Sequence, residues 1–163
     1  MDSDKKEITI RRAEEKDIPR MLELLVQVCM VHHNGRPDLF RGPATKYSES
    51  GLKKILRDPE RPVFAAVDEN DTMQGYAFCI YEQIIGDPVR TDIRTLYIDD
   101  ICVDENARGQ HIGKKLYEHV RAFAAENGFY NITLNVWSCN GKAMKFYEAC
   151  GFRPQKTGME VIL

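Results

Sequence analysis

The residues best suited to chemistry lie in one segment near the middle of the second half of the chain. Residues 103–115 read Val-Asp-Glu-Asn-Ala-Arg-Gly-Gln-His-Ile-Gly-Lys-Lys, an order that predicts the end of a strand, a short loop and a helix opening with glycines and cations. The first N–H groups of a helix lack internal partners and carry the positive end of the helix dipole, so this start is suited to binding an anion. An ordinary strand–helix turn with solvated basic residues is the alternative, because glycine-rich turns are common.

Two carboxylates and a tyrosine are the next candidates. Asp99 and Asp100 interrupt an otherwise apolar strand, and the strand period predicts that their side chains point to opposite faces. One of them would then lie among apolar neighbours, where desolvation raises a carboxyl pKa toward values useful for proton transfer. The alternative is a pair of solvated carboxylates at a bulge. Tyr147 lies on an apolar helical stripe, and its spacing alone favours a core aromatic residue.

Composition limits the class of protein. The 163 residues carry 23 Lys and Arg against 25 Asp and Glu, a formal net charge of −2, which excludes the basic excess of a general nucleic-acid binder. No apolar run approaches the roughly 20 residues of a membrane helix, and the charged start lacks a signal-peptide core. We expect one domain over residues 1–163, in the cytoplasm. Five scattered cysteines read as small buried hydrophobes, and His32-His33 has no partners at metal-ligand spacing, so we expect no metal.

Hydrophobic periodicity predicts alternating strands and helices. The predicted strands cover residues 7–12, 63–67, 74–85, 95–103, 132–136 and 159–163. The predicted helices cover residues 18–33, 48–57, about 109–127 and 143–150, with Gly128 and Gly151 as C-terminal caps. The resulting order, β-α-α-β-β-β-α-β-α-β, indicates an α/β (α+β) fold with a mixed sheet rather than a regular doubly wound one.

Two motifs resemble those of the GNAT N-acetyltransferase superfamily. Arg108-Gly109-Gln110-His111-Ile112-Gly113 is similar to the family signature Arg/Gln-x-x-Gly-x-Gly/Ala. Residues 140–152, Asn-Gly-Lys-Ala-Met-Lys-Phe-Tyr-Glu-Ala-Cys-Gly-Phe, resemble the second hallmark: an asparagine, an alanine, a Phe/Leu-Tyr pair and then Gly-Phe. The likeness spans nearly the whole chain. It implies a GNAT-like mixed, mostly antiparallel twisted sheet of six to seven strands flanked by four helices.

The resemblance also implies a site for acetyl-CoA as co-substrate. Backbone amides from Gln110 through Lys114 would hold the pyrophosphate, and the backbone of residues 101–103 would pair with the pantetheine arm. His111 replaces the first glycine of the family motif, and we expect it to keep a negative φ, so that backbone recognition persists. The residues implied in cofactor binding are Ile101, Cys102, Val103, Arg108, Gly109, Gln110, His111, Ile112, Gly113, Lys114, Asn140 and Tyr147.

For the chemistry, Tyr147 matches the family tyrosine that donates a proton to the leaving thiolate. Residues 99–103 are similar to the Glu-Asp-x-x-Val of polyamine acetyltransferases, which implies Asp99 as general base, acting through water. In ribosomal-protein N-terminal acetyltransferases a glutamate on the next strand serves instead, and Asn135 occupies that place here, which argues against that subclass. Asn140 is expected to cap its helix beside the cofactor.

The acceptor is expected to enter between residues 34–47 and 86–93. Candidate contacts are His33, Arg36, Asp38, Arg41, Tyr81 and Asp100. Their charges suit a cationic amine and a carboxylate equally, so the acceptor class stays open. The leading hypothesis is an acetyl-CoA-dependent N-acetyltransferase that transfers acetyl to a primary amine of a small molecule or peptide within a ternary complex. A non-catalytic acyl-CoA-binding or regulatory module is the alternative. We expect neither nucleic acid nor membrane as partner, and a strand at 159–163 would offer an edge for a homodimer.

Overall fold

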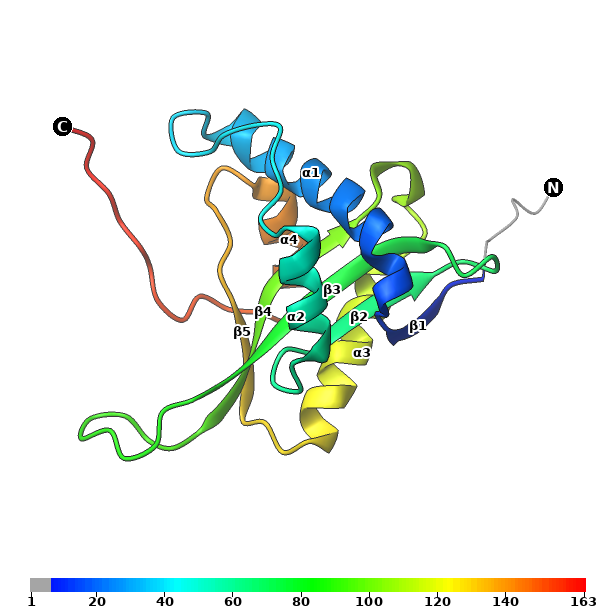
Figure 1. The fold of residues 1–163 in the computed structure, drawn as a ribbon. Helices are drawn as coiled ribbons and strands as arrows, with labels where there is room; N and C mark the ends of the chain where they lie inside the picture. Colours follow the sequence, from blue (N-terminus) through cyan, green and yellow to red (C-terminus); the bar gives the residue numbers. More distant parts are fainter. Residues whose placement is uncertain (1–6) are drawn as a thin grey trace.

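A computed structural model describes residues 7–163 of the chain (Figure 1). Within this range the strands are Thr9–Arg12 (β1), Val63–Val67 (β2), Met73–Gln83 (β3), Arg94–Val103 (β4) and Asn131–Leu134 (β5). The α-helices there are Ile18–Gly35 (α1), Glu49–Arg57 (α2), Ile112–Glu126 (α3) and Gly141–Ala149 (α4). Two short 3₁₀ helices, Glu15–Asp17 (η1) and Glu105–Ala107 (η2), lead into α1 and toward α3.

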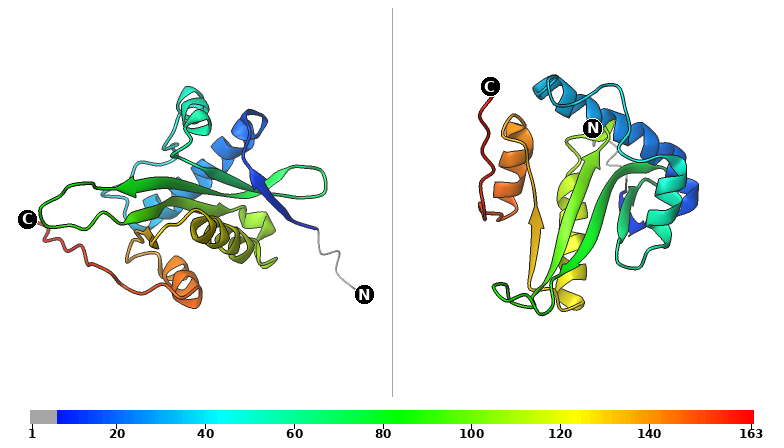
Figure 2. Two further views of the ribbon diagram at one scale, coloured as in Figure 1. Left: turned by 90° about the horizontal axis from the view of Figure 1, so that it is seen from below. Right: turned by 60° about the vertical axis from the view of Figure 1, so that its left-hand side comes forward.

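The strands form one sheet in the order β1-β2-β3-β4-β5. The first three pairings are antiparallel, and β5 joins β4 in parallel through the α3 crossover. The predicted mixed, mostly antiparallel sheet is therefore confirmed. Figure 2 shows α1 and α2 on one face of this sheet, with α3 and α4 on the other.

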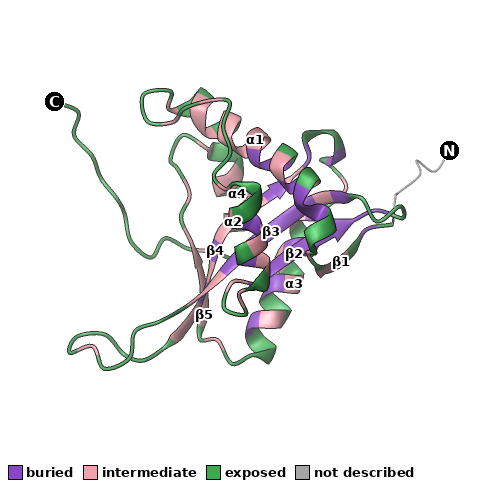
Figure 3. Ribbon diagram, viewed as in Figure 1, coloured by how far each residue is buried: buried purple, intermediate pink, exposed green. Residues whose placement is uncertain are grey.

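A separate apolar core lies on each face of the sheet, and buried residues concentrate along the central strands (Figure 3). Met21, Leu24 and Leu52 of α1 and α2 pack against one face, while Leu116 and Val120 of α3 pack against the other. Strand β2 is buried at every position, as expected for a strand covered on both faces. The apolar periodicity that predicted these helices thus reflects the faces they bury.

The structure corrects the prediction in two places. Residues 159–163 form no strand, because they pair with no other segment among the described residues, so the sheet has five strands rather than six to seven. Helix α3 starts at Ile112 rather than near Gly109, since Gly109 and His111 adopt left-handed backbone angles with φ of 85° and 59°. The predicted caps at Gly128 and Gly151 are confirmed by φ values of 71° and 97°.

One buried carboxylate fixes the turn between β4 and α3. Asp104 is buried, accepts a hydrogen bond from the Asn106 N–H at 2.9 Å and forms an ion pair with Arg20 of α1. Gln27, also on α1, accepts from the Glu105 N–H at 3.1 Å. Side chains of α1 therefore hold the turn that leads from β4 to α3, although α1 and α3 lie on opposite faces of the sheet.

Replacing this carboxylate should destabilise the fold. In Asp104→Ala, Arg20 loses a buried partner and η2 loses its cap, so the free energy of unfolding should fall by about 2–3 kcal/mol in urea denaturation. Glu23→Ala is the matched control, because Glu23 accepts from the same Arg20 at 2.7 Å but its side chain is 65% exposed. The control should lose less than about 0.5 kcal/mol. Equal losses in the two variants would contradict the role given to Asp104.

Candidate active site

The site begins where β4 and β5 part. Their parallel pairing runs only from Thr95 opposite Asn131 to Ile98 opposite Leu134. Strand β4 continues to Val103, whereas the chain leaves the sheet after Leu134 and turns toward α4. Within the described chain, the edge of β4 over residues 99–103 therefore has no strand partner on the β5 side. Backbone N–H and C=O groups on such an edge remain available to an extended ligand.

A β-bulge interrupts β4 at the same place. Phe78 pairs with Asp100 and Cys79 with Ile98, so Asp99 is the additional residue. The prediction that the two aspartates point to opposite faces is wrong, because the bulge breaks the period-two alternation. The Tyr47 hydroxyl donates to Asp99 at 2.6 Å and the Tyr76 hydroxyl donates to Asp100 at 2.8 Å. Both tyrosines belong to the core cluster on the α1 and α2 face.

The two aspartates differ in their surroundings. Burial raises the pKa of Asp100 to about 6, although the hydrogen bond from Tyr76 acts in the opposite direction. Asp99 instead accepts two contacts of 2.8 Å from Lys46. Partial burial acts to lower the pKa of Lys46, but its contact with Asp99 prevails and raises it, so Lys46 is a cation at neutral pH. Asp100 is thus buried, with a pKa not far below neutral pH, whereas Asp99 is ion-paired with Lys46.

Tyr147 reaches this region from α4. The Asn140 side chain caps the helix, as predicted, by accepting from the Ala143 N–H at 3.2 Å. The Tyr147 ring packs against Phe146 and Phe152, with centroids 5.4 and 5.7 Å apart. Burial raises the pKa of Tyr147 above its ordinary value, and the charge of Asp100 adds to the effect. The phenol is therefore a protonated group at neutral pH, electrostatically coupled to Asp100.

The start of α3 has the features of an anion site. His111 is the residue before the helix, and its side chain caps none of the first amides. The expectation of a negative φ at His111 is wrong, because its φ is 59°. Gly113 lies where an added Cβ would come 3.3 Å from Phe146, so a glycine lets α3 and α4 approach closely. The polar side chains at this start that are exposed to solvent are Arg108, His111, Lys114 and Lys115.

Four of the other residues implied in cofactor binding turn their side chains into the cores, namely Ile101, Cys102, Val103 and Ile112. Cys102 is buried against α1, with its thiol 3.8 Å from the Leu24 carbonyl, and burial raises its pKa to about 12. Ile101 and Val103 pack against the core under α3, and Ile112 is buried there as well. The side chains at these positions therefore serve packing, so a ligand bound here would contact their backbone N–H and C=O groups.

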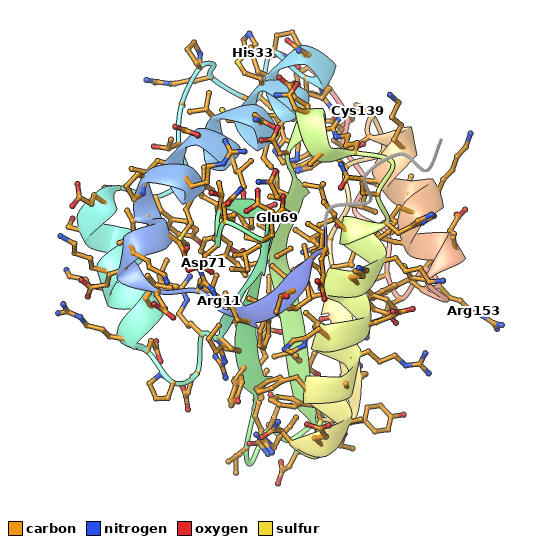
Figure 4. The ribbon with its side chains drawn as sticks, turned by 90° about the vertical axis from the view of Figure 1, so that its right-hand side faces the viewer. Arg11, His33, Glu69, Asp71, Cys139 and Arg153 are labelled. Atoms are coloured by element: carbon orange, nitrogen blue, oxygen red, sulfur yellow. The ribbon has the colours of Figure 1, made fainter. Side chains whose placement is uncertain are left out.

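The segment between α1 and α2 lies against the segment between β5 and α4. Phe40 packs on Trp137 with ring centroids 5.0 Å apart, and His33 Nδ1 lies 2.7 Å from the Phe40 carbonyl oxygen. Figure 4 shows His33 and Cys139 at the same end of the molecule. A Cβ added to Gly35 would come within 2.8 Å of the Cys139 sulfur, which confirms how closely the two segments approach.

The candidate acceptor residues do not all lie together. Arg36 forms ion pairs with Asp38 and with Glu160 of the C-terminal segment, so its charge is matched within the chain. The Arg41 carbonyl accepts from the Cys29 thiol at 3.1 Å. Tyr81 packs on Phe129 under α3, on the sheet face opposite Asp99 and Asp100, so the structure separates it from the other candidates.

Sequence reasoning missed Lys46, Tyr47 and Tyr76, whose contacts define the site around the aspartates. It also missed the packing of Trp137 on Phe40. None belongs to a motif, and only the fold brings them together. Among residues 7–163, no group of three or more His, Cys, Asp or Glu side chains is arranged to hold a metal ion. In that same range no helix combines the length and apolar character that crossing a bilayer requires.

Known proteins are similar to this chain in sequence and in fold. The sequence profile of the acetyltransferase (GNAT) family matches residues 13–152. The peptidyl-lysine N-acetyltransferase YjaB of Salmonella typhimurium is 25% identical over 148 residues, which cover 90% of this chain and 83% of the relative. Glucosamine 6-phosphate N-acetyltransferase 1 of Dictyostelium discoideum is 33% identical over 67 residues, and that match spans only 41% of each chain.

Solved structures agree with the sequence matches. A mutant of the BH1408 protein from Bacillus halodurans superposes with a TM-score of 0.91 at 30% identity, covering 95% of this chain and 99% of the other. An acetyltransferase of Trypanosoma brucei gives a TM-score of 0.71 at 23% identity over 96% of this chain and all of the other, which supports the fold alone. The resemblance inferred from the two motifs is confirmed: the chain belongs to the GNAT family of acetyltransferases.

Proposed function

We propose that this acetyltransferase uses acetyl-CoA to acetylate a primary amine of a small molecule or peptide, by direct transfer within a ternary complex. The observation that carries the proposal is the convergence of an unpaired β4 edge, the α3 start, Asp100 and Tyr147. The amine nitrogen bonds to the thioester carbonyl carbon, the carbon–sulfur bond breaks, one proton leaves the amine and one reaches the departing thiolate. The chain must therefore supply a binding surface for the co-substrate, a proton acceptor and a proton donor.

Binding of acetyl-CoA would use backbone groups more than side chains. The unpaired edge at Ile101–Val103 offers the N–H and C=O pattern that an extended pantetheine arm needs. The first amides of α3, from Gln110 through Lys114, suit the pyrophosphate because the helix leaves them without internal partners. Arg108, His111 and Lys114 are exposed around the same point and add positive charge. A local cation cluster is thus compatible with a net charge of −2.

We assign proton acceptance to Asp100, and proton donation to Tyr147. Burial brings the pKa of Asp100 to about 6, so at neutral pH it is ionised and still basic enough to accept a proton. The Tyr147 phenol, whose pKa is raised by burial, holds its proton until a strongly basic thiolate forms beside it. The charge of Asp100 also raises the pKa of Tyr147, which supports placing both groups beside the same reacting atoms.

Two observations support Asp100 over Asp99 as the proton acceptor. Asp99 is engaged by Lys46 and Tyr47 through three contacts between 2.6 and 2.8 Å, so both of its carboxylate oxygens already have protein donors. The side-chain donor to Asp100 among residues 7–163 is the neutral Tyr76 hydroxyl, at 2.8 Å. In this arrangement Asp99 serves as an anchor: it ties the segment before α2 to the bulge and so shapes the acceptor side.

The direct test is thiol release from acetyl-CoA across a panel of acceptors. The panel should contain lysine peptides, peptide N-termini, amino sugars, polyamines and aminoglycosides, with calorimetry of CoA binding in parallel. Release of one thiol per acetylated amine with any acceptor class supports the proposal. Tight CoA binding without thiol release from any of them would favour a non-catalytic acyl-CoA-binding module on the same fold.

Tyr147→Phe should reduce turnover while leaving the fold and CoA affinity intact. The change keeps the ring that packs on Phe146 and Phe152 and removes only the hydroxyl, so we expect kcat to fall by about a hundredfold or more. Tyr117→Phe is the matched control, because Tyr117 packs on the same Phe152 at 5.3 Å but lies on α3. Equal kcat values for the two variants would rule out Tyr147 as the proton donor.

The pH dependence of kcat/KM should report the ionisation of Asp100. Its carboxylate accepts a proton only when ionised, so kcat/KM should fall as the pH drops through about 6. Asp100→Asn should remove this inflection and lower kcat/KM about a hundredfold or more, whereas Asp99→Asn should keep the inflection. Since asparagine also removes a buried charge at neutral pH, Asp100→Asn should unfold at no lower urea concentration than wild type. An inflection near pH 6 that survives in Asp100→Asn would contradict the assignment.

His111 tests whether backbone geometry or the imidazole binds the phosphates. Glycine adopts the left-handed angle at this position without cost, so His111→Gly should change the Kd for CoA by less than about threefold. A β-branched valine resists that angle at about 1–2 kcal/mol, so His111→Val should raise the Kd about tenfold. Calorimetric titration with CoA measures both. If glycine weakens binding as much as valine, the imidazole itself is a ligand.

A further inference from the structure

One lysine reaches the site from a segment without regular structure. Residues 36–48 join α1 to α2 through turns and bends, and Ala44, Thr45 and Lys46 are exposed there. The Lys46 side chain is 51% exposed, whereas that of its partner Asp99 is 12% exposed. A flexible four-carbon stem therefore runs from an exposed backbone to a carboxylate at the bulge. Lys46 thus resembles the lysine of an irregular peptide bound at the site.

The ammonium of Lys46 acts on both carboxylates of the bulge. Its Nζ lies 2.8 Å from each Asp99 oxygen. Asp100 follows directly in the chain, and the charge of Lys46 acts to lower the pKa of Asp100. Asp100 in turn acts to raise the pKa of Lys46. A primary amine of the chain itself therefore lies within electrostatic reach of the residue that we assign as proton acceptor.

Tyr47 fixes the segment immediately after this lysine. Its hydroxyl donates to Asp99 at 2.6 Å and accepts from Arg61 at 3.2 Å. Its ring packs on the buried Phe78, with ring centroids 5.7 Å apart. Because Tyr47 is anchored in this way, Lys46 stays at the site when its own ion pair opens. A reactant held in place by the chain has an effective concentration far above that of a free acceptor.

We propose that Lys46 is itself an acceptor, and that the enzyme acetylates the Nζ of Lys46 within the same molecule. The inference rests on the proposed function, because it uses the same acetyl-CoA site together with Asp100 and Tyr147. It adds a modification site on the chain itself. Acetylation converts the ammonium into a neutral amide, so the ion pair between Lys46 and Asp99 is lost and the segment before α2 keeps only the Tyr47 contact with Asp99.

The reaction balances with groups already assigned. The Lys46 ammonium leaves Asp99 and releases one proton to water, and its neutral nitrogen then bonds to the thioester carbonyl carbon. The carbon–sulfur bond breaks, Asp100 takes the second proton from the nitrogen, and Tyr147 protonates the thiolate. The proton on Asp100 then restores the phenol through water. The products are an acetylated lysine, the thiol of CoA and one released proton.

The experiment follows acetylation of the full chain without added acceptor. Wild-type protein is incubated with acetyl-CoA that carries heavy carbon in its acetyl group, and labelled lysines are located by mass spectrometry after cleavage at glutamate. Lys53 is the matched internal control, because its side chain is 43% exposed and pairs with Glu49 at 3.0 Å. We expect Lys46 to be labelled at least about tenfold faster than Lys53. The first-order rate constant should stay the same between about 1 and 50 µM protein, as an intramolecular step requires.

Two variants separate catalysed from chemical acetylation. Lys46→Arg keeps a cation for Asp99 and should gain no rapid acetyl group in intact-mass spectra. Tyr147→Phe should slow the labelling of Lys46 by about a hundredfold and leave that of Lys53 unchanged. A rapid acetyl group that persists in Lys46→Arg would overturn the inference, as would labelling of Lys46 at the rate of Lys53. A rate constant that rises with protein concentration would overturn it too, because it indicates transfer between molecules.

The acceptor panel distinguishes failure of this inference from failure of the proposed function. If a free acceptor releases thiol from acetyl-CoA while Lys46 stays unlabelled, acetyl transfer stands and self-acetylation is wrong. If neither a free acceptor nor Lys46 is acetylated although CoA binds, both proposals are wrong.

Discussion

The bulge at Asp99 is the constraint on which the rest of the site depends. One additional residue in β4 turns two successive carboxylates to the same face and breaks the alternation of the strand. The parallel pairing with β5 ends immediately before it, at Ile98, so the following edge of β4 stays unpaired. A single local irregularity therefore sets the position of Asp100 and opens the backbone that faces α4.

This arrangement carries a free-energy cost that the surrounding contacts must offset. Burial moves the pKa of Asp100 from 3.8 to about 6, so holding it ionised at neutral pH costs about 3 kcal/mol. That cost already includes the opposing effect of the Tyr76 hydroxyl, which keeps it from being larger, and the Lys46–Asp99 pair compensates the second carboxylate at the bulge. Arg20 and Gln27 hold the next turn of the chain through Asp104 and Glu105. Polar contacts from α1 and from the segment before α2 thus offset the strain of an acidic bulge.

Sequence patterns predicted most of the fold because each pattern has one local physical cause. The apolar face of α3, the Asn140 cap of α4 and the left-handed Gly128 follow from burial, capping and backbone freedom, and the structure contains all three. The register of β4 was not fixed in this way, since the two successive aspartates suggested a bulge only as an alternative to a regular strand. Nor was the contact of Tyr47 with Asp99, which joins residues 52 positions apart. The site motifs were found from sequence, whereas the partners that tune them come only from the tertiary fold.

The shortness of β5 sets both the unpaired edge of β4 and the start of the segment that leads to α4. Because β5 ends at Leu134, its inner neighbour β4 keeps an unpaired edge that suits an extended co-substrate. Because β5 is also the last strand, its outer edge is open along the same residues. An unpaired edge is a hazard unless a ligand or a strand covers it. The chain that leaves β5 runs through Asn135 to Asn140 and then into the helix that carries Tyr147. The end of β5 therefore fixes both where the edge of β4 becomes unpaired and where the segment toward α4 begins.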